Sequence, residues 1–89
     1  MRFEWDSEKA AKNLRKHRVS FDEAATAFFD PLSMTVPDPD HSAGERRLIT
    51  MGASSSGRLL VVAHTERGAT LRLISARLAS ASERKRYED

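Results

Sequence analysis

The sequence of 89 residues contains no cysteine, so disulfide bonds, thiolate catalysis and cysteine-ligated zinc are excluded. It also has no long hydrophobic run, since the longest, at 59–63, is far shorter than a membrane span. None of its four glycines lies in a G-x-G-x-x-G or P-loop pattern, and no serine lies in a G-x-S-x-G elbow. The first residues are charged where a signal peptide would be apolar. We therefore expect a cytoplasmic protein without a membrane segment or a cofactor.

Metal binding through histidine also finds little support. No two of the three histidines, His17, His41 and His64, have the i, i+4 spacing of a helical zinc site. His41 follows Asp38 and Asp40, which is a weak ligand group, and a solvated loop is the simpler interpretation. We expect no metal site.

The charges are unevenly distributed along the chain. Residues 1–18 carry a net charge of +3, residues 19–45 carry −6 and residues 46–89 carry +5, which gives the overall +2. A fold that joins the two ends would form a basic face, and such a face attracts phosphate backbones. Arginine supplies eight of the nine cations in the last segment, and its planar guanidinium matches phosphate geometry. The alternative is that these cations are simply solvated.

Capping residues predict where the first two helices begin and end. A short strand at 3–5 is followed by Asp6, a good N-cap for a helix at 7–17. Ser20 and Glu23 fit a capping box, and the apolar stripe that follows predicts a second helix ending near residue 29. Asp30-Pro31 then ends this helix, because the residue before proline resists helical geometry.

The rest of the chain predicts strands joined by short turns. Strands are expected at 32–36, 46–53, 58–65 and 69–76, and short loops between strands favour antiparallel hairpins. A capping box at Ser80–Glu83 opens a short, charged C-terminal helix. The prediction is one α+β domain over residues 1–89, with a small antiparallel sheet, two N-terminal helices and a short C-terminal helix.

Metal-free RNA cleavage is a chemistry that these residues could perform. The substrate 2′-hydroxyl is then the nucleophile, and the protein supplies proton-transfer groups and cations for the developing phosphorane charge. Such residue types fall near one predicted sheet edge: His64, Arg67, Arg72 and Arg77 on the last hairpin, Tyr87 on the last helix, and Glu45-Arg46 entering the sheet.

Two histidines have simpler interpretations beside the catalytic one. His64 ends a buried strand, where its imidazole could be held by the core and still reach solvent, or could have no task. His17 closes the first helix and could simply interact with the C-terminal carbonyls.

Arg72 and Arg77 lie in a strand with apolar neighbours. Strict alternation places Leu71, Leu73 and Ser75 on one face, opposite Arg72, Ile74 and Ala76. An arginine on a half-covered face needs a carboxylate, a carbonyl or a bound phosphate. An ion pair with Glu45 or Glu23 is the structural alternative to phosphate binding.

Several motifs, taken in order, resemble one known family. The first is the run Trp5-Asp6-x-x-Lys9-x-x-x-Asn13-x-x-Lys16-His17-x-Val19-x-Phe21-x-Glu23-Ala24. Glu45-Arg46, Leu60-Val61-Val62-x-x-Thr65-x-Arg67 and Arg72-x-Ile74-Ser75-Ala76-Arg77-x-Ala79-x-x-x-Glu83-Arg84-x-x-Tyr87 follow. Together they cover nearly the whole chain and resemble the BrnT toxins.

The resemblance implies a RelE-like fold and a ribonuclease toxin that stops translation. It further implies a type II toxin–antitoxin system, whose antitoxin BrnA carries a ribbon-helix-helix domain, and a joint complex that binds operator DNA. Its alternative is a non-catalytic basic module that binds nucleic acid or protein and acts as an operon corepressor.

The resemblance also suggests roles for individual residues, with one departure from the family. The family often has an aromatic residue at the position of His64, which favours a cation-rich mechanism. Phosphate binding and charge stabilisation are assigned to Arg67, Arg72 and Arg77. Proton transfer is assigned more weakly to Lys9, His17, His64 and Tyr87, and further substrate contacts to Arg46, Lys16 and Arg84.

Overall fold

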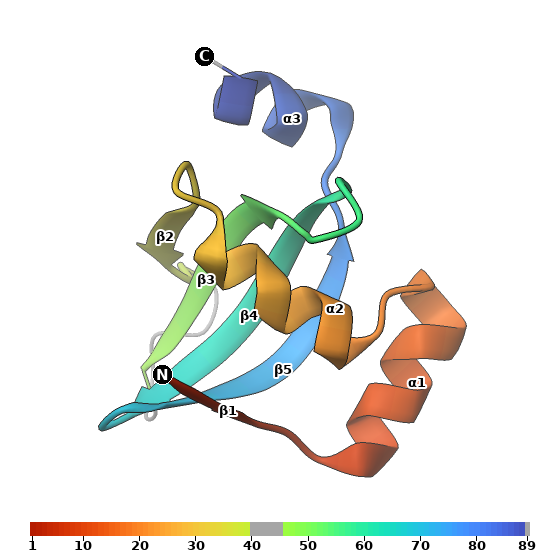
Figure 1. Cartoon of the computed structure of the whole chain (residues 1–89), viewed down its shortest axis with the longest axis vertical. Helices are drawn as coiled ribbons and strands as arrows, with labels where there is room; N and C mark the ends of the chain where they lie inside the picture. Colours follow the sequence, from red (N-terminus) through yellow and green to blue (C-terminus); the bar gives the residue numbers. More distant parts are fainter. Residues whose placement is uncertain (40–45, 89) are drawn as a thin grey trace.

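The computed structural model describes residues 1–39 and 46–88, which form one five-stranded sheet with helices against it (Figure 1). The strands lie in the order β1-β5-β4-β3-β2. In chain order the elements are β1 (Arg2–Glu4), α1 (Ser7–His17), α2 (Phe21–Thr26), the 3-10 turn η1 (Ala27–Phe29), β2 (Met34–Pro37), β3 (Arg47–Ala53), β4 (Leu59–Arg67), β5 (Thr70–Leu78) and α3 (Ala81–Glu88).

The predicted α+β architecture is confirmed, with one correction to the sheet. Each predicted strand is found within two residues of its expected ends, and β2 to β5 pair antiparallel. The first strand instead pairs parallel to β5, with Phe3 opposite Leu71. A parallel partner needs a crossover rather than a hairpin, and all the elements between β1 and β5 supply it. This pairing also brings the two basic ends of the chain together.

Side-chain caps fix the helix starts, and one capping box is only half formed. The Asp6 side chain accepts from the Glu8 amide at 3.0 Å, and the Ser20 hydroxyl accepts from the Glu23 amide at 3.0 Å. The Glu23 carboxylate does not return to Ser20, because Arg58 and two serines bind it instead. The second helix is α-helical only to Thr26 and tightens into η1 before Asp30.

The core lies between the sheet and the first two helices. Its fully buried members are Val19, Phe21, Ala24, Leu60, Val62, Leu73 and Ala76. Gly52 lets η1 approach β3 closely, because a Cβ atom there would lie 2.5 Å from the Ala27 carbonyl oxygen. Leu14 of α1 is half exposed, and Asn13 is the buried residue of that helix.

A β-bulge in β5 overturns the predicted alternation of its side chains. Val61 lies opposite Arg77, Ala63 opposite Ser75 and Thr65 opposite Arg72, so β5 contains one residue more than β4 at Ile74. Because directly opposed residues share a face, Arg72, Ser75 and Arg77 all lie on one side of the sheet. Strict alternation had placed Arg72 and Arg77 on opposite faces.

Within residues 1–39 and 46–88, no helix is both long and apolar enough to cross a membrane.

Candidate functional site

The face of the sheet turned away from α2 and η1, here called the open face, carries three arginines from two of its strands. Arg47 and Arg72 both lie opposite Thr65 in the register, and Arg77 lies opposite Val61. Thr65 is only 3% exposed, and its hydroxyl has no hydrogen-bond partner among the described residues. Arg47, Arg72 and Arg77 therefore project from one face of the sheet, which makes this face basic.

Arg77 makes a bidentate ion pair on this face. Its Nη1 and Nη2 atoms donate to the two carboxylate oxygens of Glu83 at 2.8 and 2.9 Å. These bonds, with smaller help from the Ser80 amide, lower the pKa of Glu83 to about 2. The Ser80–Glu83 capping box is complete, with Ser80 donating its amide to Glu83 at 2.8 Å and accepting from the Glu83 amide at 3.3 Å. The Glu83 carboxylate is thus bound by both terminal nitrogens of the Arg77 guanidinium, and a phosphate group would fit the same two donors equally well.

The alternative of an ion pair between these arginines and Glu23 is wrong. Glu23 accepts from Arg58 Nε at 2.9 Å and from two serines, which lowers the pKa of Glu23 to about 2. Arg72 instead lies 3.8 Å from Glu4 of β1, a long ion-pair distance, and its side chain is 35% exposed. Glu45, the other expected partner, lies outside the described residues, as do Asp40 and His41 of the proposed weak ligand group.

Three lysines and a histidine of α1 border the same part of β5. Lys9, Lys12, Lys16 and His17 line a shallow depression with Asn13, Ile74 and Ser75. Asn13 holds the helix there, because its Nδ2 donates to the Val19 and Ala76 carbonyls at 2.9 and 2.8 Å. Its Oδ1 accepts from the Ala76 amide at 3.0 Å. This structural role was not predicted, although Asn13 belongs to the motif that carried the resemblance.

His64 lies on the other side of the sheet. Its side chain is 1% exposed, stacks edge-on against Phe28 and contacts Thr50 Oγ1 through Nε2 at 2.8 Å. Burial lowers the pKa of this imidazole, and Glu66 opposes the effect only weakly. Of the two interpretations of His64, the one in which its imidazole reaches solvent is wrong, because regular alternation along β4 turns it toward the helices with Val62. Its ring is not accessible to a substrate on the open face.

Tyr87 anchors α3 rather than pointing freely to solvent. Its hydroxyl donates to the Asp30 carboxylate, and this bond is the main cause that raises the pKa of Tyr87. The other Asp30 bonds reach the Ala53 and Leu32 amides at 2.8 and 2.9 Å. The side chain thus ties the C-terminal helix to the segment after η1.

The remaining predicted residues are exposed arginines near the ends of β3, β4 and α3. Arg67 is exposed at the end of β4, opposite Thr70, Arg46 is exposed just before β3, and Arg84 is exposed on α3. Sequence reasoning overlooked Arg47, although its alternation with Ile49 and Met51 was visible. It also overlooked Arg86, for which no local pattern gave a clue. No three His, Asp or Glu side chains in the described part of the chain are grouped to hold a metal.

Comparison with solved structures identifies the fold. The crystal structure of the Brucella abortus ribonuclease toxin, BrnT, matches with a TM-score of 0.70 and 24% sequence identity, covering 90% of this chain and 97% of that one. No curated relative matches the chain. A family model described as the ribonuclease toxin, BrnT, of type II toxin–antitoxin systems matches residues 5–83.

These findings define the class, which is that of the ribonuclease toxins of type II toxin–antitoxin systems. Because the family model spans most of the sequence, the chain belongs to the BrnT family. The resemblance read from the motifs is thereby confirmed.

Proposed function

We propose that the chain is a metal-independent endoribonuclease that cuts RNA through the substrate's own 2′-hydroxyl and thereby inhibits translation. The observation that carries the proposal is that Arg47, Arg72 and Arg77 project from the same face of the sheet. Arginines fixed on strands are pre-organised, so they stabilise a phosphate charge without reorganising during the reaction.

The proposed reaction exchanges one phosphorus–oxygen bond for another. The 2′-oxygen attacks the neighbouring phosphorus, the bond from phosphorus to the 5′-oxygen breaks, and the products end in a 2′,3′-cyclic phosphate and a 5′-hydroxyl. The 2′-hydroxyl proton passes to a base, and the leaving 5′-oxygen receives a proton. The extra negative charge on the phosphorane is where cations contribute most.

The geometry supports distinct roles for the basic residues. Arg72 and Arg77 hold the scissile phosphate, with Arg67 at the hairpin end and Arg47 across Thr65 contributing charge. Lys9 and His17 are the accessible candidates for proton transfer, because α1 holds them beside Ser75 on the same stretch of β5. Lys16, Arg46 and Arg84 contact the RNA backbone further out. His64 and Tyr87 are left out of this machinery, since one is buried and the other is bound to Asp30.

The expected partner is a BrnA-like antitoxin with a ribbon-helix-helix domain. The basic open face suits an acidic segment of such a partner, which would exclude RNA by covering the arginines. The complex of the two proteins would bind operator DNA and repress its own operon.

The test compares wild-type protein with Arg77→Ala and, as a matched control, Lys85→Ala on the exposed side of α3. Purified proteins are incubated with RNA in a chelator, and the product ends are analysed. We expect cyclic phosphate ends, a loss of about 10²- to 10³-fold in kcat for Arg77→Ala and no change for Lys85→Ala. Expression of the wild type, but not of Arg77→Ala, should arrest growth.

Three results would contradict the proposal. Cleavage that requires a divalent cation would refute the mechanism, and a folded, fully active Arg77→Ala protein would refute the placement of the site. Salt-sensitive binding of RNA that stays intact would instead favour the alternative of a non-catalytic corepressor. Because Arg77 is ion-paired, the thermal stability of each variant is measured alongside.

A further inference from the structure

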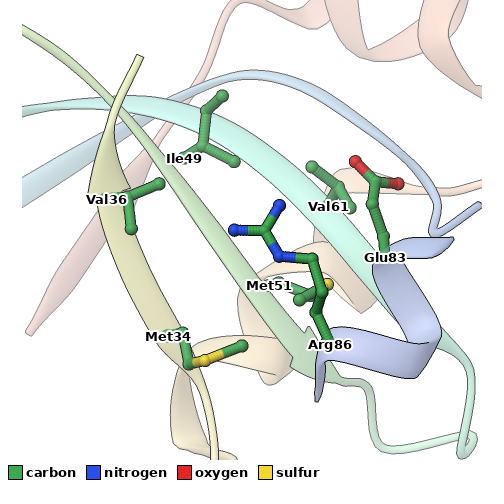
Figure 2. A pocket seen from close by; sticks show the side chains of 7 residues that line it. All are labelled: Met34, Val36, Ile49, Met51, Val61, Glu83 and Arg86. Atoms are coloured by element: carbon green, nitrogen blue, oxygen red, sulfur yellow. The ribbon is translucent and has the colours of Figure 1, made fainter. Parts of the chain in front are cut away.

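The apolar half of the open face forms a groove between the sheet and α3. It encloses about 220 Å³, and its floor consists of Met34 and Val36 on β2, Ile49 and Met51 on β3, and Val61 on β4 (Figure 2). Met34 and Val36 are 41% and 52% exposed. An apolar floor that stays open to solvent in the folded chain is a feature of binding surfaces.

A single cation covers this floor. Figure 2 shows the Arg86 side chain extending from α3, with its guanidinium lying over the groove between β2 and β4. No carboxylate pairs with this guanidinium within residues 1–39 and 46–88. The Glu83 carboxylate lines the same groove, but Arg77 and the Ser80 amide already bind it.

The groove is continuous with the proposed phosphate site. Val61 of its floor lies directly opposite Arg77 in the β4–β5 register, and the Arg77–Glu83 pair forms the adjoining wall. A phosphate bound at Arg77 would therefore have the groove beside it. Neighbouring parts of one nucleotide, an anion and a flat apolar ring, match these two neighbouring features.

We propose that this groove is the base-binding subsite of the ribonuclease, taking one unstacked base next to the scissile phosphate between the apolar floor and the Arg86 guanidinium. The inference rests on the proposed function, because it places the base by the phosphate that Arg77 holds. Proteins commonly recognise single-stranded RNA in this way, with bases stacked on aromatic rings or arginine planes.

The chemistry of the groove favours a base over an apolar side chain of a protein partner. A planar cation over an apolar floor matches the face of an aromatic ring, whereas an aliphatic side chain would gain nothing from the charge. The floor side chains are aliphatic or thioether groups that offer no strong hydrogen bonds, and the two methionines adapt to rings of different size. The base is therefore held by stacking, and the preference among the four bases is weak.

The test uses a 2′-O-methyl RNA oligonucleotide with one unmodified ribonucleotide, so that only one phosphodiester has a nucleophile. Versions lacking the base on either side of this bond are compared with the intact oligonucleotide and with one lacking a base four positions away. For wild-type protein, loss of one adjacent base should lower kcat/KM about ten- to a hundredfold, and loss of the distant base should have no effect.

Variants separate stacking by Arg86 from the general effect of charge. Arg86→Ala should cut the intact oligonucleotide slowly and should no longer respond to removal of the adjacent base, while Lys85→Ala should behave like the wild type. In a fully 2′-O-methylated oligonucleotide, 2-aminopurine at the responsive position should become more fluorescent with wild-type protein, because the base leaves its neighbours for a groove without aromatic rings, and should not change with Arg86→Ala. This binding readout does not depend on cleavage.

The outcomes distinguish failure of the inference from failure of the proposed function. Equal cleavage of intact and base-free oligonucleotides by the wild type would overturn the base subsite and leave the ribonuclease standing. Absence of all cleavage would refute the proposed function, and the 2-aminopurine measurement would then decide on base binding alone. If Arg86→Ala alters only neutralisation by the antitoxin, the groove is a protein-docking site and the inference is wrong.

Discussion

Replacing Asn13 with alanine tests how α1 is attached to the sheet. The Asn13 side chain is 6% exposed and makes three hydrogen bonds to the main chain, one to Val19 and two to Ala76. Ala76 lies in the part of β5 beyond the three residues that pair with β1, where Asn13 takes the place of a neighbouring strand. The substitution removes this substitute pairing while keeping helix propensity high.

The expected loss of unfolding free energy follows from the main-chain groups that lose their hydrogen-bond partner. Truncation leaves one amide and two carbonyls without their partner, and each buried unsatisfied group costs about 1–3 kcal/mol. Water can reach part of this region because most of α1 is exposed, so we expect a total loss of about 3 kcal/mol. For a domain of this size the midpoint of thermal unfolding shifts by about 4–8 °C per kcal/mol, or roughly 12–24 °C in all.

The assay is equilibrium unfolding in urea and in heat, followed by circular dichroism. Lys12→Ala, an exposed neighbour on the same helix, serves as the control and should change the free energy of unfolding by less than about 0.5 kcal/mol. A loss below about 1 kcal/mol for Asn13→Ala would refute the reasoning, because it would mean that these main-chain groups find other partners. The folded fraction of the variant should also cleave RNA more slowly, since Lys9 and His17 lose their fixed position.

Three further expectations concern stability. Gly52→Ala should lower the free energy of unfolding by about 1–3 kcal/mol in urea titrations, because the new methyl group meets the Ala27 carbonyl oxygen. On acidification, stability should first fall below pH 6.5, where the unfolded chain protonates His64 more readily than the fold does, and titrations of His64→Phe should lack this step. A second fall should come between pH 4.5 and about 2, as Glu23 and Glu83, whose folded pKa values are lowered, lose their ionised form. Stability that stays level across either pH window would contradict the assignment of that window.

The element boundaries were predictable because they depend on local chemistry. Asp6 and Ser20 cap the helices that follow them, and Ser80 with Glu83 forms the expected capping box. These contacts involve residues two or three positions apart, so the chain specifies them before it folds. The contact from the Glu23 carboxylate back to Ser20, which would complete the first capping box, does not form. Arg58, 35 residues away, gives the Glu23 carboxylate a charged partner instead, and local sequence could not predict this.

The residue types of the proposed site came from the sequence, but their arrangement did not. Arg72 and Arg77 were the expected phosphate ligands, yet a period of two would have separated them across the sheet. His64 ends a buried strand and could have reached solvent there, yet its place in β4 turns it under Phe28. Pairing partners and the bulge at Ile74 decide such questions, and a strand does not contain this information by itself.

By itself, the sequence determined the order of helices and strands, the basic character of both ends and the motifs of the BrnT family, because capping, periodicity and residue identity are local properties. Only the tertiary structure decided that Arg47, Arg72 and Arg77 share one face of the sheet. It also decided that Glu83 forms an ion pair with Arg77 and that Arg86 covers an apolar groove. The physical reason is that the face on which a side chain lies, and the residues that it contacts on neighbouring strands, depend on the register of strand pairing. This register is set by strands that are far apart in the chain.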